Sequence, residues 1–163
     1  MKTRIAIISA FTVLAAAIAS ASDPANPAWD KMKSLVGTWQ GTTDGRPVSV
    51  TYTLVSNGTS LMESLTGDHD TNMITMYAPD GASILATHYC AAGNQPRMRA
   101  KALSGDVKSL DFQFVDATNT GASPEVMKRL VVTFQDPAHF TQSWTSNTAG
   151  KEQTTDFVYA RTK

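Results

Sequence analysis

Apolar and polar residues alternate with a period of two along most of this chain, from residue 37 almost to the C-terminus. Residues 48–54 show the pattern clearly, because Val, Tyr and Leu at the even positions alternate with Ser and Thr at the odd ones. Such alternation is typical of β-strands that bury one face and expose the other. Turn residues interrupt it, most clearly at Asn57-Gly58, Asp80-Gly81 and Ser104-Gly105-Asp106. The pattern therefore predicts an all-β chain built from antiparallel hairpins.

About ten short strands fit between these turns. They are predicted at 37–43, 48–54, 60–66, 73–77, 83–89, 97–103, 108–115, 129–135, 139–145 and 153–161. In the longest break, 116–128, Ser123-Pro124-Glu125 predicts one helical turn with Ser as the cap and Pro at the first helical position. Many short strands leave unpaired edges unless the sheet closes. We therefore expect a single up-and-down antiparallel β-barrel over 37–163, with a two-sheet sandwich as the alternative.

Two different segments precede the strands. Residues 1–21 have the layout of a signal peptide, because two basic residues precede an apolar stretch at 5–18 and Ala19-Ser20-Ala21 offers a cleavage site. We expect a periplasmic or extracellular protein without stable membrane insertion. Residues 22–36 are predicted to be a flexible leader and a short amphipathic helix, since Trp29, Met32 and Leu35 recur at helical spacing.

Charge and cysteine content narrow the possible partners. The chain has 14 Lys and Arg against 14 Asp and Glu, and no basic block interleaves with aromatic residues. The electrostatic footprint of a nucleic-acid-binding protein is therefore absent from the sequence. Cys90 is the one cysteine, so no intrachain disulfide can form. It is a buried small residue, a reactive thiol or a metal ligand.

Residues 35–41, Leu-Val-Gly-Thr-Trp-Gln-Gly, resemble the opening of the calycin barrels, which include lipocalins and fatty-acid-binding proteins. The resemblance implies structural roles for Gly37 and Trp39, with the Trp closing one end of the barrel. Residues 88–99, His-Tyr-Cys-Ala-Ala-Gly-Asn-Gln-Pro-Arg-Met-Arg, resemble a signature of secreted, lipocalin-like bacterial proteins of mostly unassigned function. This second resemblance implies fold and export, and it implies no reaction.

Gly37, Trp39 and Gly41 also resemble the opening of the nitrobindin-like haem barrels, although Thr43 replaces the final glycine of that motif. Those proteins bind haem through a histidine on a late strand. The resemblance implies His139 as the candidate here, and nothing around it clearly matches.

A barrel of about ten strands is wider than one that side chains just fill, so we expect an internal cavity. The expected ligand is a small apolar or amphipathic molecule, with a carboxylate as one option for its polar head. His88 and Arg97 would hold that head, and Glu63 would neutralise Arg97 when the site is empty. The same alternation also allows Arg97 and Arg99 to face water. The apolar body would lie against wall residues of the barrel, namely Tyr52, Met76, Phe112, Phe114 and Trp144.

The sequence favours a non-catalytic protein, because it has no Gly-x-Ser-x-Gly motif and a dyad of Cys90 and His88 would lack an orienting carboxylate. Metal ligands could come from the same two residues with Asp68-His69-Asp70, but that triplet is predicted to be a solvated turn. We predict neither a metal site nor a resident cofactor. Two alternatives stay open: a haem or metal barrel that uses His139 or His88, and a filled barrel that acts as a structural or partner-binding envelope protein.

Overall fold

The computed structural model describes residues 26–67, 72–101 and 104–162. The expected signal peptide, most of the leader and Asp68-His69-Asp70 lie outside the described residues. One short helix precedes ten strands: α1 (Pro27–Lys33), β1 (Gly37–Thr43), β2 (Arg46–Val55), β3 (Ser60–Gly67), β4 (Asn72–Asp80), β5 (Ser83–Tyr89), β6 (Gln95–Ala100), β7 (Ser109–Thr118), β8 (Glu125–Asp136), β9 (His139–Thr148) and β10 (Lys151–Arg161).

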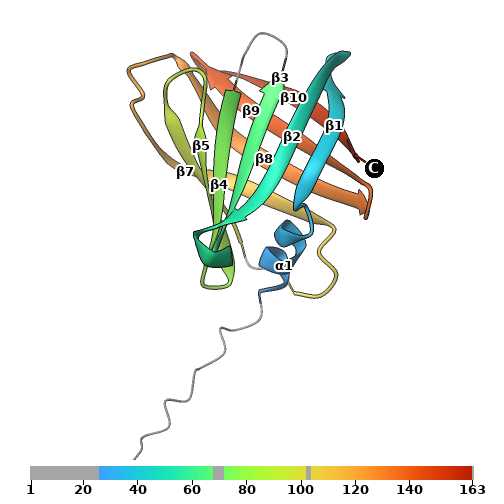
Figure 1. Ribbon diagram of the computed structural model, residues 1–163. Helices are drawn as coiled ribbons and strands as arrows, with labels where there is room; N and C mark the ends of the chain where they lie inside the picture. The colour runs from blue at the N-terminus through green and yellow to red at the C-terminus, as the bar shows by residue number, and fades with distance from the viewer. Residues whose placement is uncertain (1–25, 68–71, 102–103, 163) are drawn as a thin grey trace, which may run out of the picture.

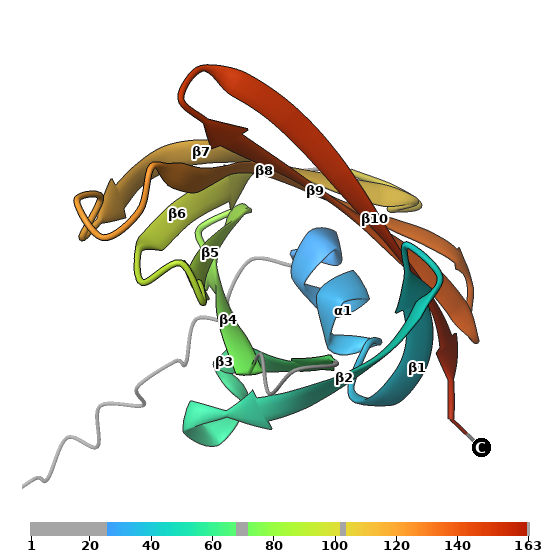
Figure 2. The ribbon, with the colours of Figure 1, turned by 90° about the horizontal axis from the view of Figure 1, so that it is seen from above.

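The strands form one closed antiparallel barrel (Figure 1). Each strand pairs with its neighbours in the sequence, and β1 closes the barrel by pairing with β10 from Trp39–Arg161 to Thr42–Val158. Seen from above, the strands surround α1, which lies across one end (Figure 2). The prediction of an all-β up-and-down barrel with a short N-terminal helix is confirmed, and the sandwich alternative is wrong. Within the described ranges, no helix has the length and apolar character needed to cross a membrane.

Most predicted turns lie where the sequence placed them. Asn57 and Gly58 both have positive φ, in a short 3₁₀ turn over Ser56–Gly58. The predicted helical turn at Ser123-Pro124-Glu125 is wrong. Glu125 already begins β8, and its backbone N–H donates to the Ser123 Oγ at 3.1 Å. The Ser side chain therefore accepts a hydrogen bond at the start of a strand. The backbone N–H and C=O groups that follow pair with β9, so no helical turn forms.

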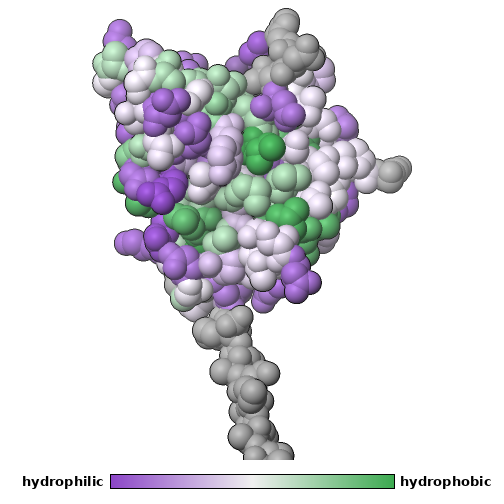
Figure 3. Space-filling model, turned by 60° about the vertical axis from the view of Figure 1, so that its left-hand side comes forward, coloured by the Kyte–Doolittle hydropathy of each residue, from purple (hydrophilic) through white to green (hydrophobic). Residues whose placement is uncertain are grey.

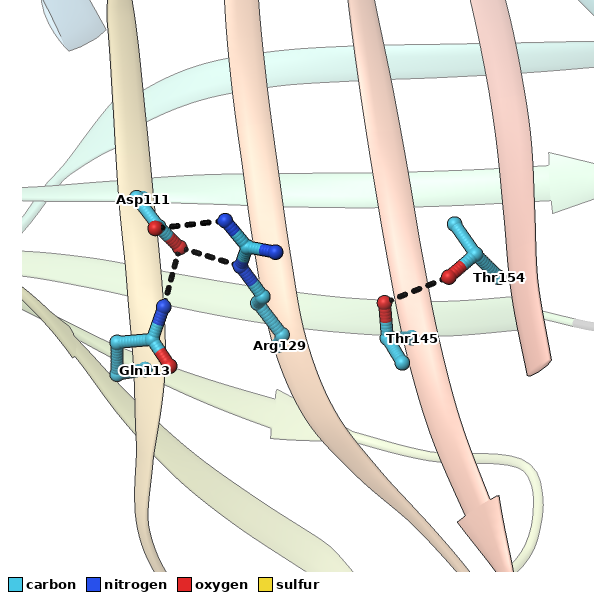
Figure 4. Close-up of polar contacts among 5 residues, drawn as sticks. All are labelled: Asp111, Gln113, Arg129, Thr145 and Thr154. Carbon is cyan, nitrogen blue, oxygen red and sulfur yellow. Dashed lines mark hydrogen bonds and ion pairs between the residues drawn. The ribbon is translucent and has the colours of Figure 1, made fainter. Parts of the chain in front are cut away.

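The outer face of the barrel carries cross-strand polar pairs. Arg129 on β8 donates two hydrogen bonds of 2.8 Å to Asp111 on β7, and Gln113 donates to the same carboxylate (Figure 4). Further along the same face, the hydroxyl groups of Thr145 and Thr154 lie 2.9 Å apart (Figure 4). The surface is not uniformly polar, since hydrophobic patches lie among hydrophilic residues on the face in Figure 3. The apolar core lies inside the barrel, where Val50, Phe112 and Leu130 are fully buried.

Trp39 is the central contact at the end of the barrel that α1 covers, where it also lines a depression of about 220 Å³. Trp39 is 1% exposed, its Nε1 donates to the Leu35 carbonyl at 2.7 Å, and its ring meets Phe140 edge-on. The guanidinium of Arg161 lies 4.1 Å from the Trp39 ring centroid and donates to the Val36 and Ser34 carbonyls. These contacts join the end of β10 to the segment after α1. We call this region the closed end.

Gly41 allows β1 and β10 to approach each other next to the closed end. A Cβ atom at this position would lie 2.2 Å from the Val158 carbonyl oxygen and 2.7 Å from the Tyr159 ring. Such distances are far inside van der Waals contact, so a larger residue would force the two strands apart. Glycine at position 41 therefore permits the pairing that closes the barrel.

Candidate functional site

A cavity of about 170 Å³ lies inside the end of the barrel opposite α1, which we call the open end. Its lining comes from both sides of the barrel, from β3, β4 and β5 on one side and from β8, β9 and β10 on the other. Carboxyl, imidazole, hydroxyl and amide groups share it with apolar and aromatic side chains. The lining residues are Glu63, Leu65, Met73, His88, Glu125, Met127, Trp144, Ser146, Gln153, Thr155 and Phe157.

A wider depression of about 380 Å³ adjoins this cavity. The two spaces share five lining residues: Leu65, Met73, Gln153, Thr155 and Phe157. The wider one also reaches the β1–β2 turn, where Arg46 lies largely exposed with its guanidinium 3.9 Å from the Asp44 carboxylate. The inner cavity therefore continues towards the surface at the open end.

Four polar side chains form one row across the interior of β2, β3, β4 and β5, which we call the polar row: Tyr52, Glu63, Thr75 and His88. Each is the direct cross-strand partner of the next, and each is at most 4% exposed. Alternation along the strands explains the row, since one residue in two faces the interior and the register aligns these four. Glu63 and His88 also line the cavity.

The Glu63 carboxyl group accepts three hydrogen bonds at one oxygen. Its Oε2 receives the Tyr52 hydroxyl at 2.8 Å, the Tyr77 hydroxyl at 2.7 Å and the Gln142 amide at 2.8 Å. Burial raises the pKa of Glu63, and these three donors act in the opposite direction. The raised pKa values of Tyr52 and Tyr77, caused first by burial and then by the nearby Glu63, keep both phenols protonated as donors.

Trp144 orients the amide of Gln142. An indole Nε1 is only ever a donor, and here it donates to the Gln142 Oε1 at 3.2 Å. The amide oxygen is thereby assigned, so the amide nitrogen faces Tyr52 and Glu63 and donates to both. A chain of donors thus runs from Trp144 at the cavity wall to the carboxyl group of Glu63.

His88 has one satisfied ring nitrogen and one without a partner. Its Nδ1 lies 2.9 Å from the Thr75 hydroxyl, and its ring packs against Trp144 with a centroid distance of 4.6 Å. Its Nε2 is buried and makes no hydrogen bond with any described residue. Burial lowers the pKa of His88 to about 4, so the imidazole is neutral near neutral pH. Folded proteins seldom leave a buried polar atom unsatisfied, and His88 lines the cavity, so it is a candidate contact for a ligand.

Several residues predicted for ligand binding lie at or next to this cavity. Glu63, His88 and Trp144 line it. Tyr52 is 1% exposed and does not line the cavity, but its hydroxyl donates to Glu63, which does. Phe112 is fully buried in the core, edge-on to Tyr77 at a centroid distance of 5.6 Å.

The expectation that Arg97 faces the interior is wrong. Its side chain is 46% exposed on the outer face, where it donates to both oxygens of Asp116, while Arg99 pairs with Asp80. Met98, between them, is fully buried. Alternation places either the arginines or Met98 inside, and Met98 is inside because β7 and β4 supply carboxylates for the arginines on the outer face. No pair of Arg97 and Glu63 forms.

Two of the predicted wall residues also lie elsewhere. Met76 is on the face of β4 opposite to Thr75 and Tyr77, so it points away from the interior. Phe114 is partly buried near the open end, and the Lys128 ammonium lies 3.5 Å from its ring centroid. Phe114 is not among the described residues that line the cavity.

The histidine suggested for haem and the lone cysteine also lie away from the cavity lining. His139 begins β9 near the closed end, where it is 56% exposed and lies 2.9 Å from the Asp136 carboxylate. Cys90 follows β5 and is half-buried, and burial raises the pKa of its thiol. Among the described residues, no three His, Cys, Asp or Glu side chains are grouped so that they could hold a metal ion.

Some residues of the site were not predicted. Gln142 lies between Phe140 and Trp144 in the alternating pattern of β9, and a polar residue at an interior position was the available signal. Tyr77 shares the interior face of β4 with Thr75 and Met73 by the same rule. Phe157 on β10, which lines the cavity, was not among the predicted wall residues either. The hydrogen bonds of Gln142 and Tyr77 to Glu63 depend on strand register, which alternation alone does not provide.

The fold and the site define a closed ten-stranded antiparallel β-barrel with a polar row beneath a cavity at one end. No family model matches the sequence, and no curated protein matches it. The chain is similar in structure to Rv2717c from M. tuberculosis, known from a crystal structure, with a TM-score of 0.59 and 13% sequence identity over 84% of this chain and 98% of that chain. This similarity shows the barrel fold alone.

Proposed function

We propose that this barrel binds a small amphipathic molecule in the cavity at the open end, with the polar end of the ligand at His88 and Glu63. The observation that carries the proposal is the buried Nε2 of His88, which has no partner among the described residues. Leaving a buried polar atom unsatisfied costs about 1–3 kcal/mol. A ligand that hydrogen-bonds to Nε2 recovers part of that free energy.

The walls of the cavity suit the apolar part of such a ligand. Met73, Met127, Trp144 and Phe157 surround it above the polar row. Its volume of about 170 Å³ is close to that of the apolar cavities of roughly 150 Å³ that take up benzene. A ring or a short alkyl chain therefore fits inside, and a longer molecule extends into the adjoining depression. The resemblance to calycin barrels, many of which carry small ligands, agrees with this proposal.

Binding is tested by calorimetric titration with octan-1-ol, which has a short apolar chain and a single uncharged polar group. Ser146 lines the cavity, while the preceding residue Thr145 lies on the outer face of β9 (Figure 4). We expect octan-1-ol to bind the wild-type protein and the Thr145→Phe variant, and to lose binding in the Ser146→Phe variant, because the new ring fills the cavity. Equal binding to both variants, or no binding to the wild type, contradicts the proposal.

We also propose that the protein acts after export, as the signal-peptide layout of residues 1–21 suggests. The intact mass of the protein recovered from its producing cells tests this. The expected mature chain begins directly after Ala21. A mass that includes the first 21 residues contradicts it.

A further inference from the structure

The ionisable side chains that line the inner cavity could give it only a negative charge near neutral pH. Glu63 lies in its floor and Glu125 in its wall, while none of the described lining residues is Lys or Arg. His88 is neutral there, because burial lowers its pKa to about 4. Arg46 belongs to the adjoining depression, where it is largely exposed beside Asp44. An anionic head group would therefore meet like charge inside the cavity.

The surroundings of Glu63 favour its ionised form through hydrogen bonds. Tyr52, Tyr77 and Gln142 all donate to Oε2, and three donors at one oxygen are typical of a carboxylate. Burial opposes that charge, and no described Lys, Arg or His side chain forms a salt bridge with Glu63. A buried carboxylate without a counter-charge is unfavourable. A cation beside it would supply the missing partner.

The second carboxyl oxygen is available for such a cation. Oε1 of Glu63 accepts no hydrogen bond from any described residue, and Glu63 lines the cavity. The cavity walls include the aromatic rings of Trp144 and Phe157, and aromatic faces attract cations. The Nε2 of His88 is a further acceptor when Nδ1 donates its proton to Thr75.

We infer that the ligand is an organic cation, such as a protonated alkylamine, whose ammonium group binds the Glu63 carboxylate while its apolar body lies against Trp144 and Phe157. This inference rests on the proposed ligand binding and names the class of ligand. It replaces the expectation of a carboxylate head, which depended on an interior Arg97. Arg97 instead pairs with Asp116 on the outer face.

Three ligands with the same alkyl chain test the inference: octylamine, octan-1-ol and octanoate, each titrated into the wild-type protein at pH 7. We expect octylamine to bind roughly tenfold more tightly than octan-1-ol, because a hydrogen bond between charged groups is stronger than one between neutral groups. Octanoate should bind most weakly, because its charge repels the carboxylates. This ranking needs no variant, so it does not depend on how any substitution folds.

The Glu63→Gln variant locates the effect. It keeps the size of the side chain and removes its charge, so octylamine should lose its advantage over octan-1-ol when both are titrated into this variant. Glu152→Gln is the matched control, because Glu152 is exposed on β10 and does not line the cavity. The control should keep the preference for octylamine.

The possible results separate this inference from the proposed function. If octan-1-ol binds and octylamine binds no better, the protein is a ligand-binding barrel and the inference of a cation is overturned. The same holds if Glu63→Gln keeps the full preference for octylamine. If none of the three ligands binds, both the inference and the proposed function are overturned.

Discussion

The two ends of the barrel differ in the surroundings of their polar side chains. At the closed end, the Trp39 Nε1 donates to Leu35, and Arg161 donates to backbone carbonyls after α1, while the buried hydroxyl of Tyr159 has no partner among the described residues. At the open end, the Nε2 of His88 and the Oε1 of Glu63 have no hydrogen-bond partner among the described residues. The difference lies in the position of the unpartnered groups: His88 and Glu63 line the cavity, whereas Tyr159 does not line it.

The contacts of the aromatic rings also differ between the two ends. At the closed end, the Phe140 ring contacts those of Trp39 and Tyr159, with centroid distances of 4.7 Å and 4.8 Å. Trp144, at the open end, packs on His88 and also borders the cavity. Making the same kind of change at each end tests this difference.

Removing a tryptophan should have the largest effect at the closed end. We expect Trp39→Ala to lower the free energy of unfolding by about 3–5 kcal/mol, because the Trp39 ring is 1% exposed and packs on Phe140 and Arg161. Trp144→Ala should lower it by less, because Trp144 has no stacked guanidinium and its indole hydrogen bond is longer, 3.2 Å against 2.7 Å at Trp39. Urea denaturation of both variants measures the two losses. Equal losses would show that the two ends are packed alike.

The second prediction concerns the dependence of stability on pH through His88. Its pKa is lowered to about 4 by burial, so the unfolded chain takes up a proton before the folded protein does. Stability is therefore lost as the pH falls from about 6.5 towards 4, by up to about 3 kcal/mol. His88→Gln should flatten this decline. Urea denaturation at several pH values, without ligand, measures the slope for each protein.

Two points make the pH experiment specific. Glu63 has the opposite sign, because its raised pKa causes a loss of stability as the pH rises above 4.5, so each variant is compared with the wild type at the same pH. His139→Gln is the control, since that side chain is 56% exposed and lies outside the cavity. Parallel curves for the wild type and His88→Gln would mean that burial of His88 does not govern the decline.

The smallest predicted effect compares two arginines. Arg161→Leu should lower the free energy of unfolding by about 2 kcal/mol, because it removes hydrogen bonds to carbonyls and the stacking on Trp39. Arg97→Leu should leave the urea midpoint nearly unchanged, because its pair with Asp116 is solvent-exposed. A larger loss for Arg97 than for Arg161 would contradict the assignment of structural importance to the closed end.

Much of the fold could be predicted because its signals are local. Alternation identified all ten strands, and Gly58 and Gly81 lie in turns with positive φ. The site was harder to predict. His88, Glu63 and Trp144 were selected as interior residues, and they line the cavity. Arg97 was selected for chemical complementarity with Glu63, although alternation with the buried Met98 argued for the outer face.

The sequence by itself determined the number, order and direction of the strands, because period-two alternation and turn residues act over a few residues. Only the tertiary structure decided which polar groups meet inside the barrel. Gln142 reaches Glu63 from 79 positions away, and β1 meets β10 only when the barrel closes. Strand register and closure set those contacts, and they left the Nε2 of His88 without a partner next to the cavity.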